Sequence, residues 1–267
     1  MTLHFTLQKM TRQSAPATLL AAAEPFERTF GTTFERFVVF PAHQLQELHQ
    51  PDSDPNSVPE NVTIGSRTDE RIVADIDVLY RVANSSDVTR QQREEYLDAL
   101  KRIYSRLPSN PGELCKRADT LCVGIEREGR LLAQEMGWLP PEHSAQPNLK
   151  RIPYEGGLVV GLVNLPPAKQ YAHCSIVDGA IASGATIISL IEHLRETIPS
   201  FSIFSAHSST EGVRAIARYF HSNGVDVTIT VGHVTTGINK KFYAIDPRDT
   251  TKLVVGDLGD TISELEE

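Results

Sequence analysis

C-S-I-V-D-G-A-I-A-S-G-A-T-I-I, residues 174–188, is the stretch from which the fold of this chain can be predicted. A largely apolar run from Cys174 to Val177 ends at Asp178, and a series of small residues follows it. Apolar side chains then recur at helical spacing, at Ile187, Ile188, Leu190, Ile191 and Leu194. The stretch therefore predicts a buried strand, a tight loop and a helix.

The loop of small residues has the chemistry of an anion site. A helix N-terminus exposes backbone N–H groups, and Ser183 and Thr186 add hydroxyl donors. Gly184 would let the backbone approach an anion closely, and Asp178 could accept hydrogen bonds from sugar hydroxyls. An ordinary strand–helix junction also carries small residues because its turn is tight, so the stretch alone leaves both interpretations open. The pattern is neither a P-loop nor G-x-G-x-x-G.

The same residues resemble the phosphate loop of the type I phosphoribosyltransferases, and most closely that of the uracil phosphoribosyltransferases. The loop of that family, V-D-P-M-L-A-T-G-G-S, aligns with residues 177–186. The resemblance implies that Asp178 faces the ribose of phosphoribosyl pyrophosphate (PRPP). It also implies that the 5′-phosphate is held by a loop consisting of Ala182, Ser183, Gly184, Ala185 and Thr186.

A second match concerns the loop that contacts pyrophosphate in the family, P-I-L-R-A-G. Arg127 and Gly129 match its Arg and Gly, whereas Glu126 and Glu128 replace an apolar and a small residue. Two carboxylates beside a pyrophosphate site would repel the anion unless Mg²⁺ or Arg130 offset them. A charged turn facing solvent explains these residues equally well, so the resemblance gives Arg127 a pyrophosphate contact without fixing the role of the two acids.

Arg151 aligns with the arginine that binds PRPP in the family. The alignment counts back from Asn164-Leu165-Pro166, which matches K-L-P ahead of the phosphate-loop strand. A guanidinium suits this role because it can bind phosphate oxygens bidentately. The alternative is an arginine on the surface with no ligand.

The segment V-V-G-D-L-G-D, residues 254–260, resembles the family's I-V-P-G-L-G-D, the loop that reads the uracil edge. By this resemblance Val254 and Gly259 provide backbone contacts to the base, and Asp260 provides a carboxylate. Together with Asp178 and Arg151, Asp260 completes the catalytic set that the resemblance implies. Several neighbouring residues differ from the family, so the pattern predicts a pyrimidine-like base without specifying uracil.

Composition limits the classes of function. The chain has 267 residues, 40% of them hydrophobic, and a net charge of −8, which disfavours nonspecific binding of nucleic acid or anionic membranes. The three cysteines have no metal-like spacing and are expected to be small buried side chains, and no pair of histidines has metal-ligand spacing. We therefore expect no protein-held metal, no membrane partner and no nucleic-acid partner. The apolar segment 19–23 is too short for a secretory signal, so we expect a cytoplasmic protein.

Strand and helix patterns alternate through most of the chain and predict an α/β fold. Residues 69–107 have the periodicity of two helices, and further strands are expected at 37–40, 121–125, 149–151, 158–163, 201–206 and 227–231. We predict an N-terminal extension over residues 1–60, and a domain over residues 61–267. The resemblance gives that domain the parallel-sheet type I phosphoribosyltransferase fold, with helices on both faces.

The function that the resemblance implies is transfer of ribose 5-phosphate from PRPP to a uracil-like pyrimidine or related heterocycle, with release of pyrophosphate. Mg²⁺ would be bound through PRPP, the partners would be PRPP and a heterocyclic base, and the assembly would be a homodimer or a higher homo-oligomer. The alternative is a non-catalytic nucleotide-binding regulator of the same fold, which the altered pyrophosphate and base loops would suit.

Overall fold

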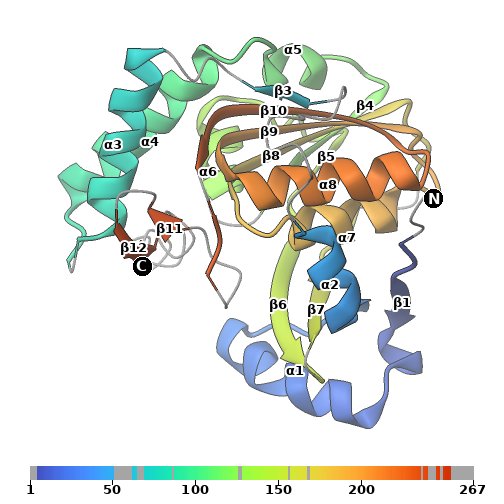
Figure 1. Cartoon of the computed structure of the whole chain (residues 1–267). Coiled ribbons are helices and arrows are strands. Elements are labelled where there is room, and N and C mark those ends of the chain that lie inside the picture. Colours follow the sequence, from blue (N-terminus) through green and yellow to red (C-terminus); the bar gives the residue numbers. More distant parts are fainter. Residues whose placement is uncertain are drawn as a thin grey trace.

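The structure is a computed structural model of the chain (Figure 1). It describes residues 5–50, 62–64, 69–85, 87–125, 128–155, 157–166, 169–235, 237–239, 245–246 and 249–253. The predicted contacts of Arg127, Val254, Gly259 and Asp260, and the position of Glu126, lie outside the described residues.

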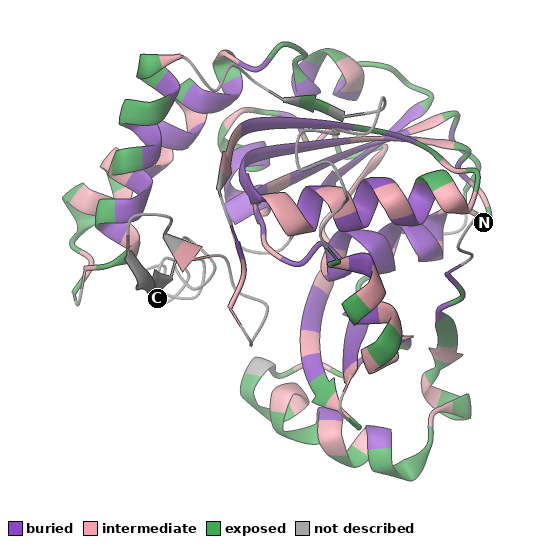
Figure 2. Cartoon of the chain, in the orientation of Figure 1, coloured by how far each residue is buried: buried purple, intermediate pink, exposed green. Residues whose placement is uncertain are grey.

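A six-stranded parallel sheet forms the centre of the molecule and confirms the predicted α/β fold. Its central strands are largely buried (Figure 2), as expected for a parallel sheet covered on both faces. Their apolar runs explain both the strand formation and the burial. The strand order is β3 (Val62–Ile64), β10 (Asp226–Thr235), β9 (Ser200–Ser209), β8 (His173–Ile181), β4 (Thr120–Gly124), β5 (Ser144–Ala145).

Helices pack on both faces of this sheet and bury two separate apolar clusters. On one face lie α7 (Ala185–Leu194) and α8 (Thr210–Ser222), whose apolar stripes meet side chains of β4, β8, β9 and β10. The other face carries α3 (Glu70–Ala83), α4 (Arg90–Ser105), α5 (Pro111–Cys115) and α6 (Glu128–Glu135).

Helices α3 and α4, predicted from their periodicity, are joined by a buried carboxylate. Asp75 on α3 is 6% exposed and pairs with Arg102 at 2.8 Å and with Arg106 at 2.5 Å, both from the C-terminal half of the α4 segment. Two guanidinium groups therefore compensate one buried charge. This pairing joins the two helices of the hairpin, which contacts the sheet at β10 through α3 and at β9 through α4.

A second, antiparallel sheet joins the first 50 residues to the rest of the chain. Its order is β1 (Gln8–Thr11), β2 (Arg36–Phe40), β7 (Gly157–Val163), β6 (Asn148–Tyr154). Helix α1 (Ala17–Phe30) covers it, with Leu19 and Phe37 fully buried in the cluster between them. Helix α2 (Ala42–Leu48) follows β2 and packs beside α8 (Figure 1). The remaining elements are a 3-10 turn (Arg12–Ser14) and the pair β11 (Ile245–Asp246) and β12 (Asp249–Leu253). None of the described helices is long and apolar enough to span a membrane.

Candidate functional site

The loop between β8 and α7 has the backbone geometry of an anion cradle. Gly184 is the N-terminal flanking residue of α7 and adopts the left-handed conformation, with φ 78° and ψ −10°, and Ala185 then starts the right-handed helix. When residues of opposite hand follow one another, three successive N–H groups curve around one concavity. Here these are the amides of Gly184, Ala185 and Thr186, placed at the N-terminus of a ten-residue helix. The predicted loop residues are thus brought together, with the last two already in the helix.

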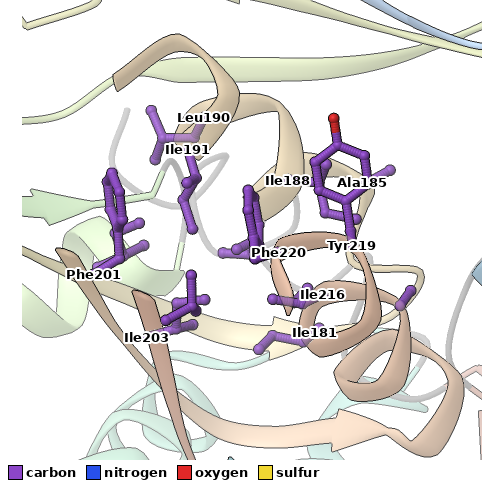
Figure 3. Packing of buried hydrophobic residues seen from close by; sticks show 14 of the residues in the cluster. Ile181, Ala185, Ile188, Leu190, Ile191, Phe201, Ile203, Ile216, Tyr219 and Phe220 are labelled. Carbon is purple, nitrogen blue, oxygen red and sulfur yellow. The ribbon is translucent and has the colours of Figure 1, made fainter. Parts of the chain in front are cut away.

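Hydrogen bonds hold the loop that forms the cradle to the end of β9, where α8 begins. The hydroxyl of Ser209 donates to the carbonyl of Ala182 and accepts from the amide of Gly212 at 2.8 Å. The hydroxyl of Ser208 donates to the carbonyl of Ile181 at 3.1 Å. Figure 3 shows Ile181 beside Ile216 of α8, and both belong with Ala185 of α7 to one buried apolar cluster, which therefore joins the end of β8, the start of α7 and α8. Because the carbonyls that lead into the loop accept hydrogen bonds from these two serines, the conformation of the loop is fixed.

Inside the loop, Ser183 is 3% exposed and Thr186 is half-buried. The amide nitrogen of Ala185 lies 3.4 Å from the Ser183 hydroxyl oxygen, which is a long and weak hydrogen bond. Gly184 has no side chain to cap the helix, and the first-turn amides of a helix have no intrahelical acceptor. An anionic oxygen would therefore be a better acceptor for these amides than the hydroxyl is.

Asp178 lies four residues before the loop, half-buried, in β8 itself rather than at the strand end predicted from the sequence. The strand extends to Ile181 because the small residues after Asp178 still pair with β9 through their backbone. The carbonyl of Asp178 accepts a hydrogen bond of 2.6 Å from the hydroxyl of Tyr104, which is also 3.1 Å from the carbonyl of Phe204. Burial, followed by the charges of Asp178 and Glu128, raises the pKa of Tyr104 well above its usual value, so this phenol remains a donor.

Glu128 was expected either beside the pyrophosphate or in solvent, and the structure excludes the solvent position. It is 5% exposed, and its carboxylate accepts a hydrogen bond from the hydroxyl of Tyr96. Burial, and next the charge of Glu128, raises the pKa of Tyr96 well above its usual value. A Cβ at Gly179 would lie 2.0 Å from Glu128 Oε2, so the carboxylate occupies the space where residue 179 has no side chain. The expectation of a solvated charged turn is therefore wrong for Glu128.

Arg151 lies on β6, the outer strand of the antiparallel sheet, opposite Val160, and is half-buried. Helix α7, whose N-terminus forms the cradle, packs against both β6 and β7. The structure therefore puts Arg151 on a different sheet from Asp178. Sequence reasoning did not find the residues that support the site, Tyr96, Tyr104 and His49, because their partners lie 32 to 134 positions away along the chain.

The three cysteines and His207 are packed inside the protein. Cys115, Cys122 and Cys174 are free and buried, as predicted. His207 and His233 are register partners on β9 and β10, and the His207 ring packs edge-on against Tyr80 at 6.2 Å. Burial, and to a lesser degree His233, lowers the pKa of His207 to about 3. Within the described part of the chain, no three His, Cys, Asp or Glu side chains have an arrangement suited to a metal ion.

Comparison with known proteins places these features beside several solved structures. No protein-family model matches the chain, and no curated protein matches it. The AQ2163 protein of Aquifex aeolicus is 19% identical, with a TM-score of 0.49 over 74% of this chain and 96% of that one. Adenine phosphoribosyltransferase of Trypanosoma brucei, in complex with AMP, pyrophosphate and ribose 5-phosphate, is 12% identical, with a TM-score of 0.41 over 76% and 96%. Orotate phosphoribosyltransferase of Mycobacterium tuberculosis, in complex with inorganic phosphate, is 8% identical, with a TM-score of 0.36 over 62% and 96%. Similarity at this level does not establish the activity of this chain.

Proposed function

We propose that the protein is a phosphoribosyltransferase that joins a uracil-like pyrimidine or related heterocycle to the ribose 5-phosphate of PRPP and releases pyrophosphate. The observation that carries the proposal is the amide cradle of residues 184–186, which follows a strand containing Asp178. A monoester dianion matches the converging N–H groups and the helix dipole. The resemblance of residues 177–186 to the motif of the uracil phosphoribosyltransferases then indicates that the anion is the 5′-phosphate of PRPP.

In this proposal the chain acts mainly by holding the donor in position. The loop from Ala182 to Thr186 binds the 5′-phosphate, and Asp178 accepts hydrogen bonds from the ribose hydroxyls. The Asp178 carboxylate also stabilises the positive charge that develops on the sugar as the bond to pyrophosphate breaks. Arg151, together with Arg127, binds the pyrophosphate end. Fixing donor and base in line makes a bimolecular step effectively unimolecular.

The base would be held by the backbone of Val254 and Gly259, with Asp260 orienting its polar edge. Mg²⁺ would be bound through the oxygens of PRPP, and the chemistry it supplies is neutralisation of charge on the leaving group. A Mg²⁺ ion that arrives with the donor needs no cage of protein ligands. We further propose a cytoplasmic protein that forms a homodimer or a higher homo-oligomer and takes PRPP and a heterocyclic base as substrates.

The proposal is tested by incubating the protein with PRPP, Mg²⁺ and a panel of pyrimidine and purine bases, and measuring release of pyrophosphate. We expect release with at least one pyrimidine-like base, and its loss in Gly184→Val, whose side chain would collide with Gly212 and Ile216 of α8 and displace the cradle. No release with any base, combined with tight binding of a nucleotide, would instead favour the non-catalytic regulator.

A further inference from the structure

A histidine of the N-terminal segment contacts the anion loop. His49 follows helix α2, and its Nε2 lies 2.9 Å from the carbonyl oxygen of Ser183. A carbonyl only accepts hydrogen bonds, so the ring must carry its proton on Nε2. Residues 134 positions apart in the sequence are thereby joined at the first peptide of the cradle.

The end of α2 that carries His49 is fixed in place by α8. Nη1 of Arg218 donates to the carbonyls of Glu47 at 2.8 Å and Leu48 at 3.1 Å, and Nη2 donates to the carbonyl of Gln50 at 3.1 Å. A guanidinium at this position satisfies carbonyls that a helix C-terminus leaves unbonded, and it suits the negative end of the helix dipole. Leu45 and Leu48 are buried on the same side of α2. Helix α8 therefore supports both α2 and the cradle, which fixes their relative positions.

The contact with Ser183 determines which way an N–H group points. In a trans peptide the C=O and N–H bonds are antiparallel, so the carbonyl of Ser183 and the amide of Gly184 point in opposite directions. The amide of Gly184 is the first of the three that line the cradle. Glycine at position 184 also permits the reversed peptide orientation, since it tolerates both signs of φ. A bond that holds the Ser183 carbonyl away from the cradle keeps the Gly184 amide directed into it.

We propose that His49 is a positioning residue for phosphate binding: by donating a hydrogen bond to the Ser183 carbonyl, it fixes the Ser183–Gly184 peptide with its N–H toward the donor's 5′-phosphate. This inference rests on the function proposed above. It also gives the segment before residue 60 a task in the site, because that segment orders the loop on which the ligand binds. His49 itself need not touch the ligand.

The test uses full-length protein and ribose 5-phosphate as the probe, with calorimetry for affinity. His49→Ala should raise the Kd for ribose 5-phosphate about tenfold, the loss expected for one hydrogen bond of about 1.4 kcal/mol. His49→Gln retains an N–H donor at similar reach and should restore the Kd to within about twofold of wild type. His43→Ala is the matched control, because His43 is an exposed histidine of α2, the helix that His49 follows.

Two further measurements separate positioning from general stability. Amide hydrogen exchange at residues 183–186 should become faster in His49→Ala, while the melting temperature and the exchange of β8 stay unchanged. In the transferase assay the KM for PRPP should rise about tenfold with kcat unchanged, as expected for loss of uniform binding. Wild-type affinity and exchange in His49→Ala would overturn this inference and leave the proposed function standing. Absence of ribose 5-phosphate binding by the wild type would instead refute the proposed function, and the role of His49 in phosphate binding with it.

Discussion

Substitution of Gly184 by alanine tests the geometry of the cradle directly. Residue 184 has φ 78°, and the left-handed conformation costs an L-residue about 1 kcal/mol. A Cβ at this position would also lie 2.9 Å from the Gly212 carbonyl oxygen and 2.9 Å from Cγ1 of Ile216. Overpacking of this kind costs about 1–3 kcal/mol. Gly184→Ala should therefore reduce the free energy of unfolding by about 2–4 kcal/mol.

Gly31 at the end of α1 provides the matched control. Its φ is 60°, but no atom lies within 4 Å of the position that a Cβ would occupy. Gly31→Ala should therefore lose only the conformational part, about 1 kcal/mol. Urea denaturation of both variants gives the difference, which isolates the contact between the start of α7 and α8. Because that contact sets the direction of the amides, Gly184→Ala should also weaken binding of ribose 5-phosphate, whereas Gly31→Ala should not. Equal losses of stability with wild-type binding would refute the described geometry of the cradle.

Three further perturbations have defined outcomes. Asp178→Asn should lower kcat by about 10²-fold or more at unchanged melting temperature, because a neutral amide cannot stabilise the developing charge, and an unaltered rate would reject the sugar contact. Wild type should lose about 1.4 kcal/mol of stability between pH 7.5 and pH 5.5 that His207→Leu does not lose. The reason is that the unfolded chain protonates this histidine near its ordinary pKa, whereas the folded chain keeps it neutral down to a pKa of about 3. If wild type and His207→Leu instead lost stability in parallel as the pH falls, the prediction would be wrong. Asp75→Ala should lower the free energy of unfolding by about 2 kcal/mol, because it leaves two partly exposed arginines unpaired. Glu95→Ala, which removes an exposed ion pair, should lower it by less than about 0.5 kcal/mol. Thermal denaturation measures both, and similar losses in the two variants would contradict the buried pairing.

The sequence predicts the local elements of the site well, because they depend on short-range patterns. The apolar period of residues 187–194 identifies α7, and the small residues ahead of it identify the tight loop. The exact end of β8 is harder to predict. Gly179 and Ala180 have the composition of a loop, yet they continue the strand because β9 offers backbone partners that require no particular side chain.

The apolar periodicity of the sequence does not predict which distant strands pair with each other. Strands near residues 37, 149 and 158 are each predicted, but an apolar pattern does not say that β2 pairs with β7 in an antiparallel sheet separate from the main one. For the same reason nothing local marks His49 as a partner of Ser183. The roles assigned to Arg127, Val254, Gly259 and Asp260 stay predictions from resemblance, because these residues lie outside the described part of the chain.

The structure gives a packing explanation for two residues that differ from the family motif. The uracil phosphoribosyltransferase motifs have Pro and Ala where this chain has Gly179 and Glu128, and these positions lie against each other, since a Cβ at residue 179 would meet Glu128 at 2.0 Å. A side chain lost on β8 and one gained on α6 therefore fill the same space, which is a volume-conserving exchange. The hydroxyl of Tyr96 then satisfies the carboxylate that the exchange buries. A stable fold requires such compensation in packing whether or not the site is catalytic. At Glu128, then, departure from the motif does not favour a non-catalytic regulator over a transferase.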